Sequence, residues 1–498
     1  MRYLLTAEQM KTCDSTEINH YGVPSIVLME RAALAVRDVI LERWPKALKI
    51  LVICGSGNNG GDGFAAARLL NMAGRRADVL FVGSHSRMTD ETAKEAEIFT
   101  NHSGTILPDD SGVKGYDLIV DALFGIGLSR EVIGRYADII HAVNRSDAPV
   151  VAIDIPSGVG ADDGRVLGCA VRADVTVTMA YAKLGLMLYP GAEYCGEVIV
   201  ADIGITTAGL REEPVTALED GDLLSLLPPR KRTANKGTYG KLLVIAGTRN
   251  MAGAACLAGR AAYRTGCGLV CICSHEDNRL ILQTALPEAI YAPWQEDINR
   301  WLDWADAVAI GPGLGQGEDS LQLLIQVLQN WDGPLVLDAD ALNLMAAHPE
   351  LLPAADESGD AVPGSTAPAV ITPHPGEMAR LIPSDIAGIL SEPVAAARDY
   401  AEQSGLVTVL KGARTVIADG EETYLNLTGN EGMATGGSGD VLTGIIGSLL
   451  AQGLRPMEAA KAGVLLHGMA GDAAAAALGT RSMTAADIAD HLPDVMNG

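Results

Sequence analysis

The sequence predicts an α/β protein made of two doubly wound domains. Short apolar runs that end in glycine or aspartate alternate with segments whose apolar residues recur near the 3.6-residue period of a helix. This alternation fills residues 25–205 and begins again at residue 241, after an irregular, acidic stretch. Strands that alternate with helices form mainly parallel sheets with helices on both faces.

In the first half, two helices are predicted before the first strand, at residues 6–21 and 25–43. Apolar runs typical of buried parallel strands follow at residues 49–54, 77–82, 118–121, 150–154 and 173–179. A helix at residues 65–73 is expected to connect the first two strands, after a glycine-rich loop. The order strand, loop, helix, strand is that of a parallel sheet.

The pattern lapses between Ile205 and Leu223, where loop-like residues precede an acidic cluster. We therefore predict a first domain at residues 1–212, a linker at 213–224 and a second domain at 225–498. Strands of the second domain are expected at residues 241–246, 268–273, 307–310, 334–337, 369–371 and 407–410. Residues 353–368 are small, polar and proline-containing, which indicates an exposed loop.

Composition excludes several partners and compartments. The 498 residues carry 37 basic and 62 acidic side chains, a net charge of −25, which disfavours nucleic acid and anionic lipid. No apolar run reaches the roughly 18 residues of a membrane helix, and no signal peptide is evident. The eight cysteines form no CxxC pair, so we expect reduced thiols in the cytoplasm rather than a zinc site.

A glycine-dense turn near the C-terminus is the most informative motif. The residues Thr435-Gly436-Gly437-Ser438-Gly439-Asp440 run directly into a small, apolar helical stretch. Such a turn presents free N–H groups and the positive end of the helix dipole to anions, above all phosphates. Asp440 beside that site suits a base that activates a hydroxyl. The alternative is an ordinary helix start capped by Ser or Asp.

A second glycine-rich turn, at residues 55–63, lies between a strand and a helix of the first half. Asp121 and Asp154 end two further strands of the same half. Because ligands of doubly wound sheets bind at the carboxyl ends of the strands, we expect these polar groups to line one crevice. Capping of a turn or helix is the alternative for each Asp.

Three motifs of the first half, GSGNNGGDG, DALFGIGL and DIPSG, resemble the NAD(P)H-hydrate epimerase domains of bifunctional NAD(P)H-hydrate repair enzymes. The resemblance implies a Rossmann-like three-layer sandwich that epimerises NAD(P)HX, the hydrated nucleotide, at C6, with Asp154 as the proton-shuttling carboxylate. It implies substrate contacts at Asn58, Asn59, Gly60, Gly61, Asp62, Gly125, Ile126, Gly127, Leu128, Ser129, Arg130, Glu131 and Asp154. It also implies K⁺ ligands at Asn59, Asp121 and Ser157; oxygen ligands of low total charge suit such a cation.

The second half resembles the ADP- or ATP-dependent NAD(P)H-hydrate dehydratases, which have a ribokinase-like fold. The motifs, in order, are GPGLG, the Asp338-Ala339-Asp340 strand end, TPHPGE, KGART and TGGSGD. The resemblance implies that Gly315, His374 and Asp440 contact the hydrate, with Asp440 as the base. It implies nucleotide contacts at Lys411, Gly412, Ala413, Arg414, Thr415 and Gly439, with Mg²⁺ and ADP or ATP. One family motif that usually begins with His begins here with Asn235.

Simpler interpretations compete with some of these roles. His374 could cap a turn, Lys411 could be a solvated lysine, and His467, on a helix rich in Ala and Gly, is expected to pack in the core. At the level of the whole chain, one alternative is a ribokinase-like kinase of a vitamin alcohol, and another is a nucleotide-sensing scaffold. The fused first domain disfavours the kinase. The family is commonly oligomeric, so a homo-oligomer acting on a small-molecule substrate is expected.

Overall fold

The computed structural model describes residues 2–108, 112–352, 368–382 and 384–496. The predicted loop at 353–368 lies outside these ranges except for its last residue. The chain forms two compact units, an N-terminal unit of Tyr3–Val215 and a C-terminal unit of Thr216–Gly498 with Met1–Arg2. Residues 213–224, expected to be a linker, contain β10 (Val215–Leu218), a 3₁₀ turn and the first residues of α6 (Leu223–Leu226).

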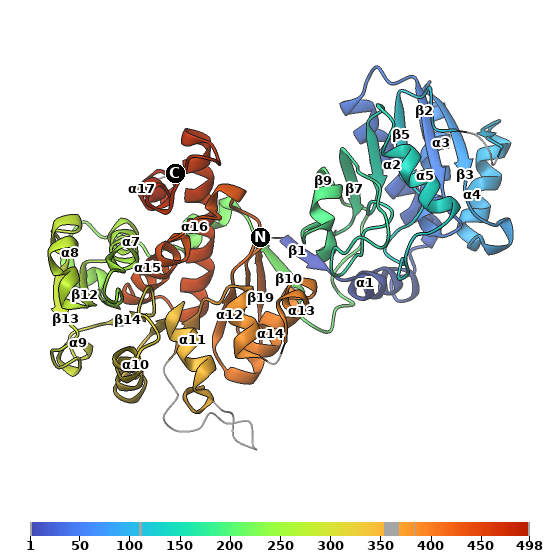
Figure 1. Cartoon of the computed structure of the whole chain (residues 1–498). Coiled ribbons are helices and arrows are strands. Elements are labelled where there is room, and N and C mark those ends of the chain that lie inside the picture. The colour runs from blue at the N-terminus through green and yellow to red at the C-terminus, as the bar shows by residue number, and fades with distance from the viewer. Residues whose placement is uncertain (1, 109–111, 353–367, 383, 497–498) are drawn as a thin grey trace. The chain divides into compact units, whose positions relative to one another are not determined.

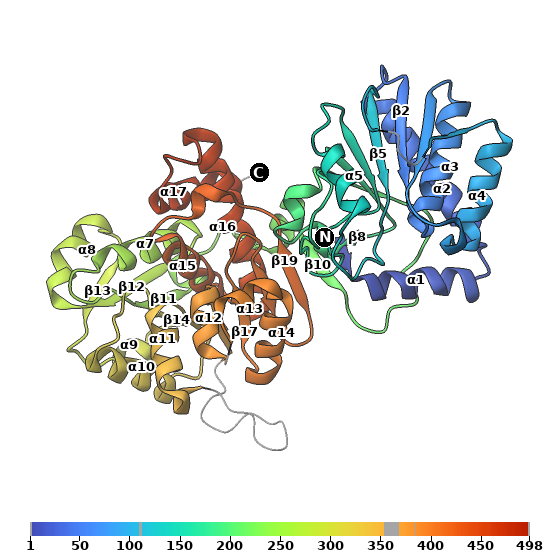
Figure 2. The ribbon, with the colours of Figure 1, turned by 45° about the vertical axis from the view of Figure 1, so that its right-hand side comes forward.

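The N-terminal unit is built on a seven-stranded sheet with the order β4-β3-β2-β5-β6-β7-β9 (Figures 1 and 2). All neighbouring strands in it run parallel. The strands are β2 (Lys49–Cys54), β3 (Arg76–Phe81), β4 (Thr105–Ile106), β5 (Leu118–Ala122), β6 (Val150–Ile153), β7 (Val175–Met179) and β9 (Glu197–Ala201). The strands that follow β2 in the chain, β3 and β4, extend the sheet on one side of β2. From β5 onward, the strands extend it on the other side. The sheet therefore has its topological switch point between β2 and β5.

Helices cover both faces of this sheet, so the predicted doubly wound fold is confirmed. The helices are α1 (Ala7–Asn19), α2 (Ser25–Arg43), α3 (Asn58–Met72), α4 (Asp90–Asn101) and α5 (Arg135–Val143). Alternate residues of a strand face opposite sides. Ile50 and Val52 of β2 accordingly share a core with α2, α3 and α4, whereas Leu51 packs with α5 on the other face.

A short parallel pair of strands lies beside this sandwich. It joins β1 (Arg2–Leu5) to β8 (Ala182–Lys183), with Leu5 opposite Lys183. Leu5 and the Lys183 side chain are both fully buried. The pairing therefore fixes the backbone from which the Lys183 side chain extends.

The C-terminal unit is built on a larger sheet with the order β13-β12-β11-β14-β15-β16-β17-β18-β19-β10. The strands from β13 to β17 run parallel, β18 is antiparallel to both neighbours, and β10 is parallel to β19. Its strands besides β10 are β11 (Lys241–Ile245), β12 (Leu269–Ser274), β13 (Ile290–Pro293), β14 (Ala307–Ile310), β15 (Leu335–Leu337), β16 (Ala369–Ile371), β17 (Val407–Leu410), β18 (Val416–Ala418) and β19 (Thr423–Asn426). The switch point here lies between β11 and β14.

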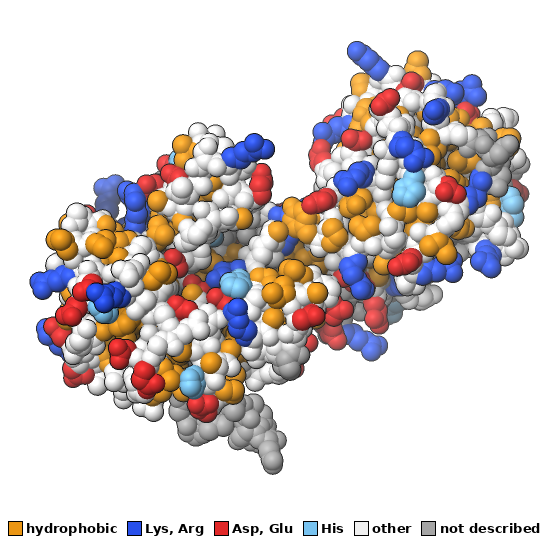
Figure 3. Space-filling model, viewed as in Figure 1, with side chains coloured by type: hydrophobic (Ala, Val, Ile, Leu, Met, Phe, Trp, Pro, Cys, Tyr) orange, Lys and Arg blue, Asp and Glu red, His pale blue; other side chains and the backbone are white. Residues whose placement is uncertain are grey.

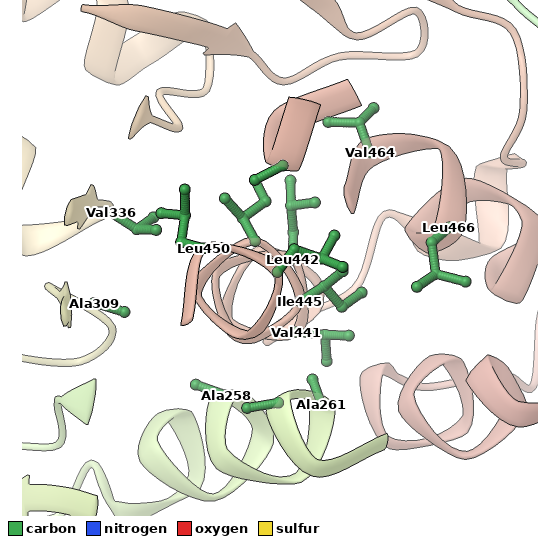
Figure 4. Packing of buried hydrophobic residues seen from close by; sticks show 14 of the residues in the cluster. Ala258, Ala261, Ala309, Val336, Val441, Leu442, Ile445, Leu450, Val464 and Leu466 are labelled. Atoms are coloured by element: carbon green, nitrogen blue, oxygen red, sulfur yellow. The ribbon is translucent and has the colours of Figure 1, made fainter. Parts of the chain in front are cut away.

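Helix α15 is the centre of the core on one face of this sheet. Figure 4 shows Leu442 and Ile445 of α15 between side chains of α7, α16 and the strands. Gly444 of α15 approaches α7 so closely that a Cβ built on it would lie 2.1 Å from the carbonyl oxygen of Ala258. The helices are α6, α7 (Ala252–Arg264), α8 (Arg279–Ala285), α9 (Asn299–Leu302), α10 (Glu318–Asn330), α11 (Asp340–Ala347), α12 (Pro375–Leu381), α13 (Ile386–Ser391), α14 (Pro393–Ser404), α15 (Ser438–Ala451), α16 (Pro456–Leu478) and α17 (Ala485–Met496).

On the face seen in Figure 3, Lys and Arg side chains are interspersed with Asp and Glu and do not gather into one basic patch. Among the residues described, no helix is both long enough and apolar enough to cross a bilayer.

Gly444→Ala tests the close contact of α15 with α7. The added methyl group cannot fit against a backbone oxygen at 2.1 Å, so the helices must separate, which costs about 1–3 kcal/mol. The measurement is urea denaturation followed by tryptophan fluorescence, because four of the five tryptophans (294, 301, 304 and 331) lie in the C-terminal unit. Gly253→Ala on α7 is the matched control, since its Cβ would meet nothing within 4 Å. Equal midpoints for the two variants would contradict the packing described.

Candidate active sites

The glycine-rich motif of the N-terminal unit is the first turn of a helix and only in part a loop. The expected helix at residues 65–73 begins already at Asn58. Gly60 is needed there because a Cβ would lie 2.0 Å from the carbonyl oxygen of Gly55, and a Cβ on Gly63 would meet Ala122 and Cys54 below 3 Å. The glycines thus let α3 pack directly on β2 and β5, with its amino end at the switch point.

The three predicted K⁺ ligands lie together beside that helix start. Asp121, at the end of β5, accepts hydrogen bonds from the backbone N–H (2.8 Å) and the hydroxyl (2.6 Å) of Ser157. The Asn59 amide donates to the carbonyl oxygen of Phe124 (3.0 Å), whose own N–H donates to the Ser157 hydroxyl (2.8 Å). Hydrogen bonds therefore hold four kinds of oxygen close together: the Asn59 amide oxygen, the Phe124 carbonyl oxygen, the Ser157 hydroxyl and the Asp121 carboxylate.

These oxygens fit a monovalent cation. Asp121 is 2% exposed, and burial raises its pKa, although hydrogen bonds from Ser157 and Leu123 oppose the rise. Asp121 forms no ion pair with any residue that the structure describes. A buried carboxylate without a protein cation is stabilised by a bound ion, and oxygen donors carrying one negative charge match K⁺ better than zinc.

Asp154, at the end of β6, is bound to a buried lysine. The Lys183 ammonium donates to Asp154 Oδ1 (2.5 Å), to the Thr178 hydroxyl (3.0 Å) and to the Met179 carbonyl oxygen (2.9 Å). Lys183 is 0% exposed. Asp154 itself has the positive φ of 69°, which is unusual for a residue other than glycine and marks a constrained position.

Asp62, in α3, is the second acidic side chain of this site. It forms no hydrogen bond or ion pair with the residues described. Burial, followed by the negative charge of Asp154, raises its pKa well above the ordinary value, while Lys183 opposes the rise. The predicted segment Gly125 to Glu131 follows β5 as a mostly exposed turn, with Gly125 directly against the Asn59 side chain.

In the C-terminal unit, a buried ion pair lies beneath the Thr435–Asp440 turn. Asp338, at the end of β15, is 1% exposed and accepts from the Lys411 ammonium (2.8 Å) and the Thr443 hydroxyl (2.7 Å). Burial disfavours the charge of Lys411, but Asp338 and then Glu377 raise its pKa above normal. Lys411 is therefore a paired, partly buried cation and not a solvated one.

The Lys411 ammonium also faces the start of α15. A Cβ built on Gly439 would lie 3.2 Å from it, so the ammonium lies close against the backbone of this turn. Gly437 precedes the helix with a φ of 92°, and no side chain caps the helix start. The Lys411 ammonium thus lies close to the first N–H groups of α15. Together these donors are suited to bind a phosphate.

Asp440 has no cation of its own. It lies in the first turn of α15 and forms no hydrogen bond or ion pair with the described residues. Burial raises its pKa to about 7, aided by the negative charges of Asp338 and Asp340 and opposed by Lys411. Asp440 is consequently able to accept and release a proton near neutral pH.

The other predicted residues of this unit lie on neighbouring strand ends. The N–H of Gly315 donates to Asp340 (2.8 Å). His374 caps α12, its Nδ1 accepting from the N–H groups of Gly376 (2.9 Å) and Glu377 (3.2 Å), while the half-exposed ring faces outward. The nucleotide-contacting segment Lys411 to Thr415 connects β17 to β18.

His467 does more than pack. Its Nε2 lies 3.3 Å from the Ser438 hydroxyl in the turn, and burial lowers its pKa to about 4, with Lys411 contributing. The ring is neutral at pH 7 and helps to hold the turn. Asn235 caps a short 3₁₀ turn by accepting from the N–H of Gly237 (2.9 Å).

Two family models match the chain. Residues 242–494 match the family described as NAD(P)H-hydrate dehydratase, and residues 25–185 match the family described as YjeF-related protein N-terminus. A bifunctional NAD(P)H-hydrate repair enzyme of Moorella thermoacetica is 39% identical over 99% of this chain and 96% of its own length. The enzyme of that description from Escherichia coli is 38% identical over 96% of this chain and 90% of its own length.

The chain belongs to the bifunctional NAD(P)H-hydrate repair enzyme family. A solved ribokinase-like superfamily protein from Enterococcus faecalis is 29% identical and covers 57% of this chain and 95% of its own, with a TM-score of 0.50. The family predicted from the motifs and the ribokinase-like fold of the C-terminal unit are thereby confirmed.

In this repair-enzyme chain, several side chains that shape the two sites were not predicted as site residues. They are Lys183, Asp338, Glu377 and Thr443. Asp338 ends a predicted strand, and that position could have indicated a site residue in the sequence. Lys183 had none, because a single lysine in an apolar segment does not reveal a buried partner 29 residues away.

Lys411→Met tests the buried pair with Asp338. Removing the cation leaves a buried carboxylate without compensation, so we expect a loss of about 3–5 kcal/mol in the free energy of unfolding of the C-terminal unit. The measurement is urea denaturation followed by tryptophan fluorescence. The double variant Asp338→Asn/Lys411→Met should recover much of the loss, because the Asp338 carboxylate is then no longer left without its partner. A single variant as stable as the wild type would contradict the pairing.

Proposed function

We propose that this chain repairs hydrated NAD(P)H with two active sites. The N-terminal site interconverts the R and S forms of NAD(P)HX at C6, and the C-terminal site dehydrates the S form to NAD(P)H at the expense of ADP or ATP. The observation that carries the proposal is the arrangement of Asp440, the Asp338–Lys411 pair and the glycine turn. It combines a carboxyl group whose pKa burial raises to about 7 with a glycine-rich helix start, a feature that is suited to a phosphate.

At the dehydratase site, the C6 hydroxyl, a poor leaving group, is converted into a phosphate ester, because phosphate is a good leaving group. Asp440 takes the proton of the C6 hydroxyl, and the freed oxygen attacks the terminal phosphorus of the nucleotide. The phosphoanhydride bond to that phosphorus breaks, so AMP leaves when the donor is ADP, and ADP leaves when it is ATP. Lys411 and the N–H groups at the start of α15 stabilise the charge that develops on the transferred phosphoryl group. Phosphate then leaves C6 while a proton leaves C5, which restores the dihydronicotinamide ring.

Mg²⁺ fits this site as a companion of the nucleotide. Among the residues that the structure describes, no group of three or more His, Cys, Asp or Glu could hold a metal ion. Mg²⁺ is commonly held by substrate phosphates with few protein ligands, so such a cluster is not required. When bound, it would offset phosphate charge. His374 and Gly315 are assigned to the hydrate, and the segment Lys411–Thr415 to the nucleotide, by the resemblance of their motifs to those of the family.

At the epimerase site, nitrogen expels the C6 hydroxyl and water returns to the other face of the ring. Asp154 is assigned the proton transfer, because it follows β6, the neighbour of β5, and because only its Oδ1 accepts hydrogen bonds from the described residues. Asn58 to Asp62 and Gly125 to Glu131 are assigned to the substrate, and Asn59, Asp121 and Ser157 to K⁺. Cytoplasmic localisation and homo-oligomeric assembly stay predictions.

Asp440→Ala is expected to abolish dehydration and to leave epimerisation intact. The measurement supplies S-NADHX with ADP or ATP and follows the return of absorbance of the reduced ring. Epimerisation, followed by chromatography, is the control that the variant chain is folded. Substantial dehydration by Asp440→Ala would exclude Asp440 as the base.

The pH dependence of the wild type follows from the pKa of Asp440, about 7. A base works in its deprotonated form, so kcat/KM for dehydration should be low at pH 6, rise through pH 7 and level off above pH 8. Initial rates at saturating nucleotide over this range provide the test. A rate that is constant from pH 5.5 to 8.5 would contradict the assignment.

K⁺ should activate epimerisation. At constant ionic strength, replacing K⁺ by the smaller Li⁺ should lower the rate, and Asp121→Asn should remove this cation dependence together with most of the activity. Asp174→Asn is a matched control, because the Asp174 side chain accepts from the backbone N–H of Val150 (2.7 Å) at the opposite end of the strands. A wild-type rate that is insensitive to the cation would refute the K⁺ site.

A further inference from the structure

An irregular segment leads into the glycine-rich turn of the C-terminal unit. Residues 427–437, all of which the structure describes, connect β19 to α15 with one 3₁₀ turn, Glu431–Met433. Gly429 and Gly437 have φ values of 102° and 92°, which a residue with a side chain rarely adopts. A segment with so little regular structure is positioned mainly by the scaffold on which it lies.

Helix α16 is the scaffold of this segment. A Cβ built on Gly468 of α16 would lie 2.1 Å from the Thr428 hydroxyl oxygen, and one built on Gly471 would lie 2.3 Å from the Met433 sulfur. The two glycines therefore let the segment lie directly on the helix. The helix is itself held by the core of the unit, in which Val464 is buried (Figure 4).

Two polar side chains of α16 attach the segment at its two ends. Near the start, Asp472 accepts hydrogen bonds from the backbone N–H of Gly429 (2.8 Å) and from the side-chain amide of Asn430 (2.9 Å). At the other end, Nε2 of His467 lies 3.3 Å from the hydroxyl oxygen of Ser438, the first residue of α15. One helix thus fixes both the entry to the segment and the point where α15 begins.

These attachments bear on the groups that are suited to a phosphate. Ser438, Gly439 and Asp440 form the first turn of α15, whose N–H groups have no acceptor within the helix. The Lys411 ammonium lies close to the backbone of this turn. Donors that are already fixed in the binding geometry need not be ordered when a ligand arrives, so affinity rises with their preorganisation.

Neither side chain offers a positive charge to a phosphate. Burial lowers the pKa of His467 to about 4, so its ring is neutral at pH 7. Asp472 is an exposed carboxylate, whose charge repels an anionic ligand. An increase in nucleotide affinity that depends on these two residues must therefore come from the position of the segment and not from their charge.

We propose that His467 and Asp472 are positioning residues for nucleotide binding. By fixing both ends of residues 427–437 on α16, they hold the start of α15 ready for the phosphates of ADP or ATP. The inference rests on the proposed dehydratase function and adds two residues outside the glycine-rich turn. Gly315 and His374, which are assigned to the hydrate, follow other strands, so the effect is expected on the nucleotide and not on the hydrate.

Asp472→Ala tests the attachment near the start of the segment. Loss of its hydrogen bonds should raise the Kd for ADP by about 3–10-fold, measured by isothermal titration calorimetry on the full chain with Mg²⁺ and without hydrate. Removal of a negative charge would by itself tighten the binding of an anion, so the direction of the change separates position from charge. A Kd that rises less than about threefold, or falls, would overturn the role of Asp472.

His467→Leu removes the contact with the Ser438 hydroxyl, whereas His467→Gln keeps a side chain that can make it. In His467→Leu the KM for ADP in dehydration should rise by about 3–10-fold while the KM for the hydrate stays within about twofold. His467→Gln should recover most of the difference. A general loss of packing would change both KM values without such a recovery. An unchanged KM for ADP, KM values that rise together, or a Gln variant no better than the Leu variant would overturn the role of His467.

Asp490→Ala and His491→Leu on α17 are matched controls. Asp490 is exposed and accepts from Arg260 (2.6 Å), and Nδ1 of His491 lies 2.6 Å from an Asp494 carboxylate oxygen. Both variants should bind ADP as the wild type does. Should His467→Leu fail to fold, Asp472→Ala decides the inference, because an exposed side chain is replaced there without disturbing the core.

The wild-type protein separates this inference from the function on which it rests. If it fails to dehydrate the hydrate with either nucleotide, the proposed function is wrong. If it dehydrates the hydrate and Asp472→Ala binds ADP with a Kd within about threefold of the wild type, only the present inference is overturned.

Discussion

A carboxyl group that is removed from water must have its charge compensated or must keep its proton. Both units of this chain meet that constraint in both ways, side by side. Asp154 and Asp338 each hold a lysine ammonium, at 2.5 and 2.8 Å. Asp62 and Asp440 form no ion pair with the residues that the structure describes, and burial raises the pKa of each. Each unit thus contains one carboxyl group paired with a lysine and one without such a partner among the described residues.

The backbone makes this division possible. In each unit the chain leaves the sheet in opposite directions on either side of a switch point. In each unit a glycine-rich helix also begins beside the carboxyl ends of the strands. Glycine is required at Gly60, where a Cβ would meet the Gly55 carbonyl oxygen, and at Gly439 it lets the Lys411 ammonium lie close to the backbone. Close approach brings the helix dipole, the free N–H groups and the strand-end carboxyl groups to one place.

The sequence was sufficient for the sheet architecture, because apolar runs and the helical period are local signals. It was insufficient where tertiary packing overrides propensity. Asn58 to Gly63 contains poor helix formers and was predicted as a loop, yet it is helical, since only glycine fits against β2 and β5. The stretch 213–224 looked like a linker but contains β10, whose hydrogen bonds to β19 join residues about 200 positions apart. His467 was predicted only to pack, and its bond to Ser438 has no signature in the sequence.

The most direct measurement of the central claim is a ¹³C NMR titration of the Asp440 carboxyl group. The protein would carry ¹³C in its aspartate carboxyl groups, and Asp440 would be assigned by the resonance that is lost in Asp440→Asn. The structure predicts a midpoint near pH 7, since burial, Asp338 and Asp340 together outweigh Lys411. A midpoint near pH 4, the ordinary value of an exposed aspartate, would show that the group is neither desolvated nor left without a cation, and would contradict the account.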